Sequence, residues 1–168
     1  MAEERNTLAW PSIEQFPREI ARRINRFFDC AEAYGRDNQA ERALGTALAG
    51  RRAEAIIASK FGKHKPLWEC DGLPEDAMYD VYTKEAIHAA LDRSLAALQT
   101  DYIDLYQVHW PVNLGLLSET KAAQDEVVAA LEEAKLAGKI RYYGVCNFGT
   151  DDLARVRARS SVPKLHTP

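Results

Sequence analysis

Short apolar runs that end on a polar residue recur along the chain. The runs are Ile24–Phe28, Ala55–Ser59, Ile103–Val108 and Ile140–Cys146, and the residues that follow them are Asp29, Lys60, His109 and Asn147. Runs of this length, bounded by polar residues, are typical of buried strands. Parallel strands gather their carboxyl ends at one rim, which is where α/β folds place their chemistry. The pattern therefore predicts an active site in which a carboxylate, an ammonium group and an imidazole meet.

Amphipathic stretches of helical period separate these runs, so the chain is predicted to alternate strand and helix. Helices are expected over Pro17–Arg26, Asn38–Ala49 (stopped by Gly50), Glu119–Ala137 (ended by Gly138) and Asp151–Arg159 (capped by Thr150). Thr83 is expected to cap a further helix, whose apolar face is Ile87, Leu91, Leu95 and Leu98. A long loop is expected over Phe61–Tyr82 and a fifth strand near Val162–Leu165.

The residues around the strand ends resemble motifs of the aldo-keto reductase family over roughly residues 24 to 165. The matching stretches are Phe27-Phe28-Asp29-Cys30-Ala31-Glu32-Ala33-Tyr34-Gly35, Ile56-Ile57-Ala58-Ser59-Lys60, Thr100–Pro111 and Gly138–Phe148. Four such motifs in family order are highly specific, whereas one alone is moderate evidence. The resemblance implies an α/β fold, an incomplete (β/α)8 TIM barrel of four to five parallel strands. Residues 1–16 then form an atypical N-terminal segment, and residues 17–168 form the partial barrel domain.

The resemblance also implies roles for individual residues. Asp29, Tyr34, Lys60 and His109 correspond to the family's catalytic tetrad, which reduces aldehydes and ketones with NADPH. Asp29 would hold Lys60, Tyr34 would donate the proton, and His109 would orient the carbonyl oxygen. Asn147 would bind the nicotinamide together with Cys146, which stands where serine is usual, and Asp29 is also placed in the cofactor site. Trp110 is expected on the substrate side.

Each residue also has a structural reading that needs no chemistry. Tyr34 can be a packing residue, and Asp29 can cap a helix. Lys60 can be a strand-end lysine whose aliphatic stem is buried while its ammonium group reaches water. Rim packing explains Trp110 equally well. Glu32 and Arg36 are expected to be solvated. The four tetrad candidates gain weight only jointly, because separate accidents would have to fall at strand ends in the family's order.

Composition removes several other classes of protein. The chain has 168 residues, 46% hydrophobic and 28% charged, with a net charge of −3, which is typical of a globular protein and gives no nucleic-acid footprint. No apolar run approaches the roughly 20 residues of a membrane helix. Three scattered cysteines and no signal-peptide pattern favour free thiols in the cytoplasm. The histidines form no metal constellation, and the chain has neither a Rossmann glycine fingerprint nor a P-loop.

Length raises a second hypothesis. A complete (β/α)8 barrel takes about 250 residues, so the sequence is expected to be a partial copy without the last strands and the cofactor-phosphate loops of the family. Weak or absent activity and self-association through open barrel edges follow as expectations. The alternative function is a catalytically silent pseudoenzyme or interaction subunit, similar to the potassium-channel β subunits.

Overall fold

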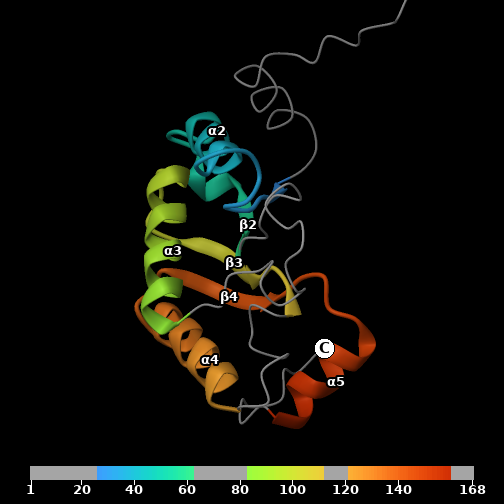
Figure 1. The fold of residues 1–168 in the computed structure, drawn as a ribbon. Helices are drawn as coiled ribbons and strands as arrows, with labels where there is room; N and C mark the ends of the chain where they lie inside the picture. The colour runs from blue at the N-terminus through green and yellow to red at the C-terminus, as the bar shows by residue number, and fades with distance from the viewer. Residues whose placement is uncertain (1–25, 63–82, 112–120, 160–168) are drawn as a thin grey trace, which may run out of the picture.

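The computed structural model describes residues 26–62, 83–111 and 121–159, in which strands and helices alternate (Figure 1). The strands are β1 (Phe27–Asp29), β2 (Ile56–Phe61), β3 (Ile103–Val108) and β4 (Ile140–Val145). The helices are α2 (Gln39–Ala47), the 3₁₀ turn η1 (Arg52–Glu54), α3 (Lys84–Leu98), α4 (Lys121–Leu136) and α5 (Thr150–Arg159).

All four described strands are parallel and lie in the order in which they occur along the chain, β1-β2-β3-β4. The register places Asp29 beside Ala58, Lys60 beside Gln107, and Val108 beside Val145. Because every strand runs the same way, all the carboxyl ends lie at one edge of the sheet. The parallel sheet expected of a partial barrel is therefore observed.

Strand boundaries match the prediction at β3 and shift slightly elsewhere. The strand that was expected to end before Lys60 continues through Lys60 to Phe61, which is fully buried and stacks on Tyr106 with ring centroids 5.2 Å apart. Phe61 extends the strand because it packs on the helix-covered face. Lys60, one position earlier, points to the opposite face.

Helix α3 forms the centre of the helical layer, between α2 and α4 (Figure 1). Thr83 caps it as predicted, with its hydroxyl accepting from the Ala86 backbone N–H at 3.3 Å. The predicted apolar stripe is buried along its whole length: Ile87, Leu91, Leu95 and Leu98. The stripe belongs to the same hydrophobic core as the buried residues of β2 and β3.

Helix α2 is shorter than predicted at both ends. Asn38 lies outside it because its backbone is left-handed, with φ of 58°, and its side chain donates to Glu41. The helix ends at Ala47, three residues before Gly50, which was expected to stop it. Gly45 allows α2 to pack directly on α3, since a Cβ at this position would lie 2.6 Å from the Leu98 backbone. A side chain there would require the two helices to move apart.

The face of the sheet opposite the helices is exposed in part, because some of its apolar side chains are buried and others are not. Phe27, Ile56 and Tyr142 lie on this face by strand alternation and register. Their exposed fractions are 50%, 47% and 68%. Within the described ranges, no helix combines the length and the apolar character that crossing a bilayer requires.

Several predictions concern residues outside the described ranges. They are the N-terminal segment 1–16, most of the helix Pro17–Arg26, most of the loop Phe61–Tyr82, and the strand Val162–Leu165. The helix expected to start at Glu119 is described from Lys121 onward, and α5 begins at Thr150, the residue that was expected to cap it.

Candidate active site

The ammonium group of Lys60 is the centre of the polar cluster at the carboxyl ends of β1 and β2. Its Nζ donates to Asp29 Oδ1 at 2.7 Å, to the Cys30 carbonyl at 2.8 Å and to Tyr34 Oη at 3.2 Å. Lys60 itself is only 2% exposed, whereas the Asp29 side chain is 52% exposed and Tyr34 is 41% exposed. The cluster thus places a buried cation beneath two groups that solvent or a ligand can reach.

Local backbone geometry brings Tyr34 back over Lys60. The Cys30 N–H donates to the Ala58 carbonyl, which continues the β1–β2 pairing past Asp29. The Tyr34 N–H then donates to the Ala31 carbonyl, and Gly35 follows with a φ of 84°, a left-handed conformation that favours glycine. The turn places the Lys60 Nζ 4.8 Å from the centre of the Tyr34 ring.

The charge of Lys60 is stabilised although the side chain is buried. Burial alone would lower the pKa of Lys60, but hydrogen bonds to Asp29 and Tyr34 outweigh it and raise that pKa above its ordinary value. Lys60 therefore stays protonated across the neutral range.

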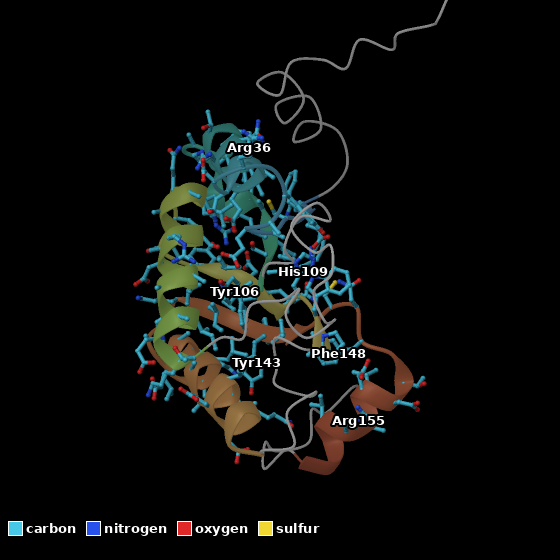
Figure 2. All side chains as sticks on the ribbon, viewed as in Figure 1. Arg36, Tyr106, His109, Tyr143, Phe148 and Arg155 are labelled. Carbon is cyan, nitrogen blue, oxygen red and sulfur yellow. The ribbon has the colours of Figure 1, made fainter. Side chains whose placement is uncertain are left out.

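His109, labelled in Figure 2, follows directly after β3. Its ring lies edge-on to Tyr34, with centroids 5.9 Å apart. Burial and the nearby Lys60 ammonium lower the pKa of His109, so its imidazole is neutral at neutral pH. Its Nδ1 is buried and has no hydrogen-bond partner among the described residues. A neutral imidazole has one N–H donor that can serve a ligand oxygen.

Trp110 and Asn147 flank His109. The Trp110 ring stacks on the imidazole with centroids 5.4 Å apart. The Asn147 amide donates to the His109 carbonyl at 2.8 Å, and its backbone is left-handed with φ of 57°. Cys146 is partly buried beside it, and its N–H donates to the Val108 carbonyl at 2.8 Å. The structure therefore brings every predicted site residue to one rim of the sheet.

Two of the three cysteines fall within the described residues, and both are free thiols. Burial, followed by the nearby Glu41 carboxylate, raises the pKa of Cys30 to about 12. Cys30 therefore stays protonated and contributes its backbone carbonyl, not its thiol, to the cluster.

Glu32 was predicted to be solvated, and that prediction is wrong. The residue is 1% exposed, and its Oε1 accepts from the Gly62 backbone N–H at 2.9 Å. Its backbone N–H also donates to the Lys60 carbonyl at 3.2 Å. Sequence reasoning missed Glu32 because a charged residue in a short loop ordinarily faces water. Its position between Asp29 and Tyr34 was the available signal.

The opposite end of the sheet holds a second charged cluster, centred on Asp104. Its carboxylate accepts from Arg52 and from Arg141, each at 2.7 Å, and from the Ile57 backbone N–H at 2.9 Å. Both guanidinium groups also pack on the Tyr102 ring, at 4.0 and 4.2 Å from its centroid. Although burial acts against it, these hydrogen bonds lower the pKa of Asp104 below its ordinary value.

The family follows from the sequence as a whole. The model of the Aldo/keto reductase family matches residues 18–166, and the chain belongs to this family. The aldo-keto reductase YhdN of Bacillus subtilis is 39% identical over 141 residues, which are 83% of this chain and 37% of that protein. The 6-dehydroglucose reductase of Novosphingobium aromaticivorans is 37% identical over 136 residues, 76% of this chain and 39% of its own. The chain spans about two fifths of the length of these relatives.

Solved structures agree with the fold. The holo form of an aldo-keto reductase from Bacillus halodurans superposes with a TM-score of 0.62 at 34% identity, covering 82% of this chain and 41% of that one. An aldo-keto reductase from Klebsiella pneumoniae, in complex with NADP and acetate, superposes with a TM-score of 0.60 at 28% identity. The match covers 90% of this chain and 46% of that one. The predicted fold class, an incomplete (β/α)8 barrel, is confirmed.

Proposed function

We propose that this chain carries the catalytic half of an NADPH-dependent reductase of aldehydes or ketones. The observation that carries the proposal is the contact of one buried, protonated lysine with both an exposed carboxylate and an exposed phenol. A packing or solvating role for Lys60 would not need two exposed partners to converge on it. Polar groups that converge in this way are typical of active sites.

The roles of the four side chains follow from their chemistry. Tyr34 is the proton donor to the carbonyl oxygen, and Lys60 stabilises the phenolate that remains. Asp29 holds Lys60 in place through the 2.7 Å hydrogen bond. His109, kept neutral, donates a hydrogen bond to the carbonyl oxygen and orients it. Trp110, stacked on that imidazole, supplies an apolar wall for the substrate.

The residues at the rim fit a nicotinamide. Asn147 is exposed and offers an amide that can pair with the carboxamide of the ring, while Cys146 contributes a weaker donor than a hydroxyl would. Asp29 extends from the same rim toward the cofactor side. When bound, NADPH supplies the hydride that reduces the carbonyl carbon. The NADP-bound relative from Klebsiella supports this choice of cofactor.

The proposal is tested in a complete barrel. Residues 24–165 are placed in YhdN of Bacillus subtilis in exchange for its matching segment, and NADPH consumption is followed by absorbance with a small aromatic aldehyde. Turnover in this chimera, lost when Tyr34 becomes Phe, supports the proposal. A folded chimera that binds NADPH but shows no turnover would favour the silent interaction subunit instead.

The isolated chain is proposed to self-associate and to show weak or no reductase activity. Phe27, Ile56 and Tyr142 are exposed apolar side chains on one face of the sheet, and β1 and β4 each have one unpaired edge in the described sheet. Sedimentation velocity across a concentration series measures this directly, and a monodisperse monomer would contradict it. The two free thiols agree with a reducing compartment, which makes the cytoplasm part of the same proposal.

A further inference from the structure

Glu32 forms hydrogen bonds to the end of β2 through both its backbone and its side chain. Its backbone N–H donates to the Lys60 carbonyl at 3.2 Å, and its carboxylate accepts from the Gly62 N–H at 2.9 Å. Between these two points lies Phe61, whose carbonyl accepts from the His109 backbone N–H at 2.9 Å. The backbone that carries Lys60 and the backbone that carries His109 are therefore joined at the segment held by Glu32.

Burying the Glu32 carboxylate costs desolvation free energy, so we look for a role that this burial serves. The side chain is fully buried, and the nearest cation in the described chain, Arg93 of α3, lies 3.6 Å away and is 52% exposed. A buried carboxylate pays a large desolvation cost unless hydrogen bonds and opposite charge offset it. Residues that break the local rule of burying apolar groups are concentrated at functional sites.

The held segment also has an unusual backbone. Gly62 adopts a φ of 106°, a conformation that side chains rarely tolerate. The strand ends here, so the Gly62 N–H has no ladder partner in the described sheet. The Glu32 carboxylate supplies the acceptor that the sheet does not, and so determines where the chain leaves β2.

We propose that Glu32 is a positioning residue, which holds the Phe61–Gly62 backbone so that Lys60 and His109 keep their places at the rim. The purpose of this positioning rests on the proposed function, whereas the hydrogen bonds of Glu32 do not depend on it. Glu32 does not touch the substrate or the cofactor in this assignment. It acts through the two strands whose ends carry the reacting groups.

Two variants of similar size separate the geometry from the charge. Glu32→Gln keeps the side-chain length and an oxygen acceptor for the Gly62 N–H but removes the charge. Glu32→Asp keeps the charge but is one methylene too short to reach the same N–H. We expect amide exchange at Gly62, followed by NMR in this chain, to accelerate at least tenfold in Glu32→Asp and to stay within threefold of wild type in Glu32→Gln.

The readouts include a site signal that general destabilisation would not produce. The chemical shifts of the His109 ring should differ from wild type in Glu32→Asp and stay near the wild-type values in Glu32→Gln. The Ile57 N–H, bonded to Asp104 at the far end of the same strand, should exchange at the wild-type rate in both variants. Glu41→Gln is the matched control, since this buried carboxylate bonds Ser59 of β2 but not Gly62.

Equal exchange at Gly62 in the two Glu32 variants would overturn the proposal, as would loss of protection at Gly62 and Ile57 together. Because no turnover is measured, these outcomes are independent of the reductase activity. Failure of the chimera to reduce aldehydes would count against the proposed function and leave the role of Glu32 as a strand-end clamp intact.

Discussion

The two ends of the sheet bury opposite charges in different ways. At the amino end, the buried Asp104 carboxylate accepts from a backbone N–H, from the largely buried Arg52 and from Arg141, whose side chain is 57% exposed. At the carboxyl end, the Lys60 ammonium is just as buried, but two of its three partners are side chains that remain exposed. Each cluster therefore has an exposed partner, but at the amino end that partner is a guanidinium group, which keeps its proton, whereas at the carboxyl end both side-chain partners are exposed and one is a phenol. In barrels of this kind the carboxyl end carries chemistry and the amino end carries stability.

The largest expected effect is on turnover at the carboxyl end. In the chimeric barrel, Tyr34→Phe removes the hydroxyl that we propose as the proton donor and should lower kcat by about 10²–10⁴-fold. NADPH affinity and the urea midpoint should stay near those of the parent chimera, since the hydroxyl acts on the substrate oxygen. Turnover within a few-fold of the parent would show that Tyr34 is not the acid.

Removing the anion at the amino end should instead affect stability. Asp104→Ala leaves Arg52 and Arg141 facing each other and the Ile57 N–H without an acceptor, at a cost of about 3 kcal/mol in the free energy of unfolding. Urea denaturation followed by circular dichroism at low protein concentration measures it. Arg51→Ala, which breaks an exposed ion pair with Glu54 next to this cluster, should cause no measurable change. If the two variants behave alike, the amino-end cluster is not the stabilising one.

A sharper contrast comes from removing the buried cation. Lys60→Met replaces the ammonium with an apolar side chain of similar size, and the exposed Asp29 and Tyr34 can then be hydrated. The unfolding free energy should change by less than about 1 kcal/mol, while turnover in the chimera should be lost. A destabilisation as large as that of Asp104→Ala would mean that both ends of the sheet are structural.

The smallest effect expected is a change in pH dependence. Because the folded pKa of Asp104 is lowered, its contribution to stability is present above the unfolded value of about 3.9 and is lost as the pH falls through the folded pKa. Asp104→Asn should therefore flatten the acid side of the stability curve. Urea midpoints measured between pH 2 and pH 7 test this, and a variant curve parallel to wild type would contradict it.

Sequence reasoning could predict which residues gather at this rim because they follow apolar runs, and strand alternation then fixes the face that each occupies. The end of β3 could be predicted in this way from His109, and the end of β1 to within one residue from Asp29. The end of β2 could not, since Phe61 belongs to the strand only by virtue of packing on Tyr106, 45 residues further along the chain. Glu32 escaped for a similar reason, because its acceptor role depends on Gly62, 30 residues away.

Gly45 affects the candidate site although it lies in the helical layer and not at the rim. The surfaces of α2 and α3 touch here through backbone atoms, so the separation of the two helices is set by a single hydrogen atom. One turn earlier on the same helix, Glu41 receives a hydrogen bond from Ser59, the residue before Lys60, and another from Asn38 in the segment that follows Tyr34. A methyl group at position 45 would tilt α2 and draw Glu41 away from both partners. We therefore expect the placement of Tyr34 over Lys60 to be sensitive to the spacing of the helices on the opposite face of the sheet.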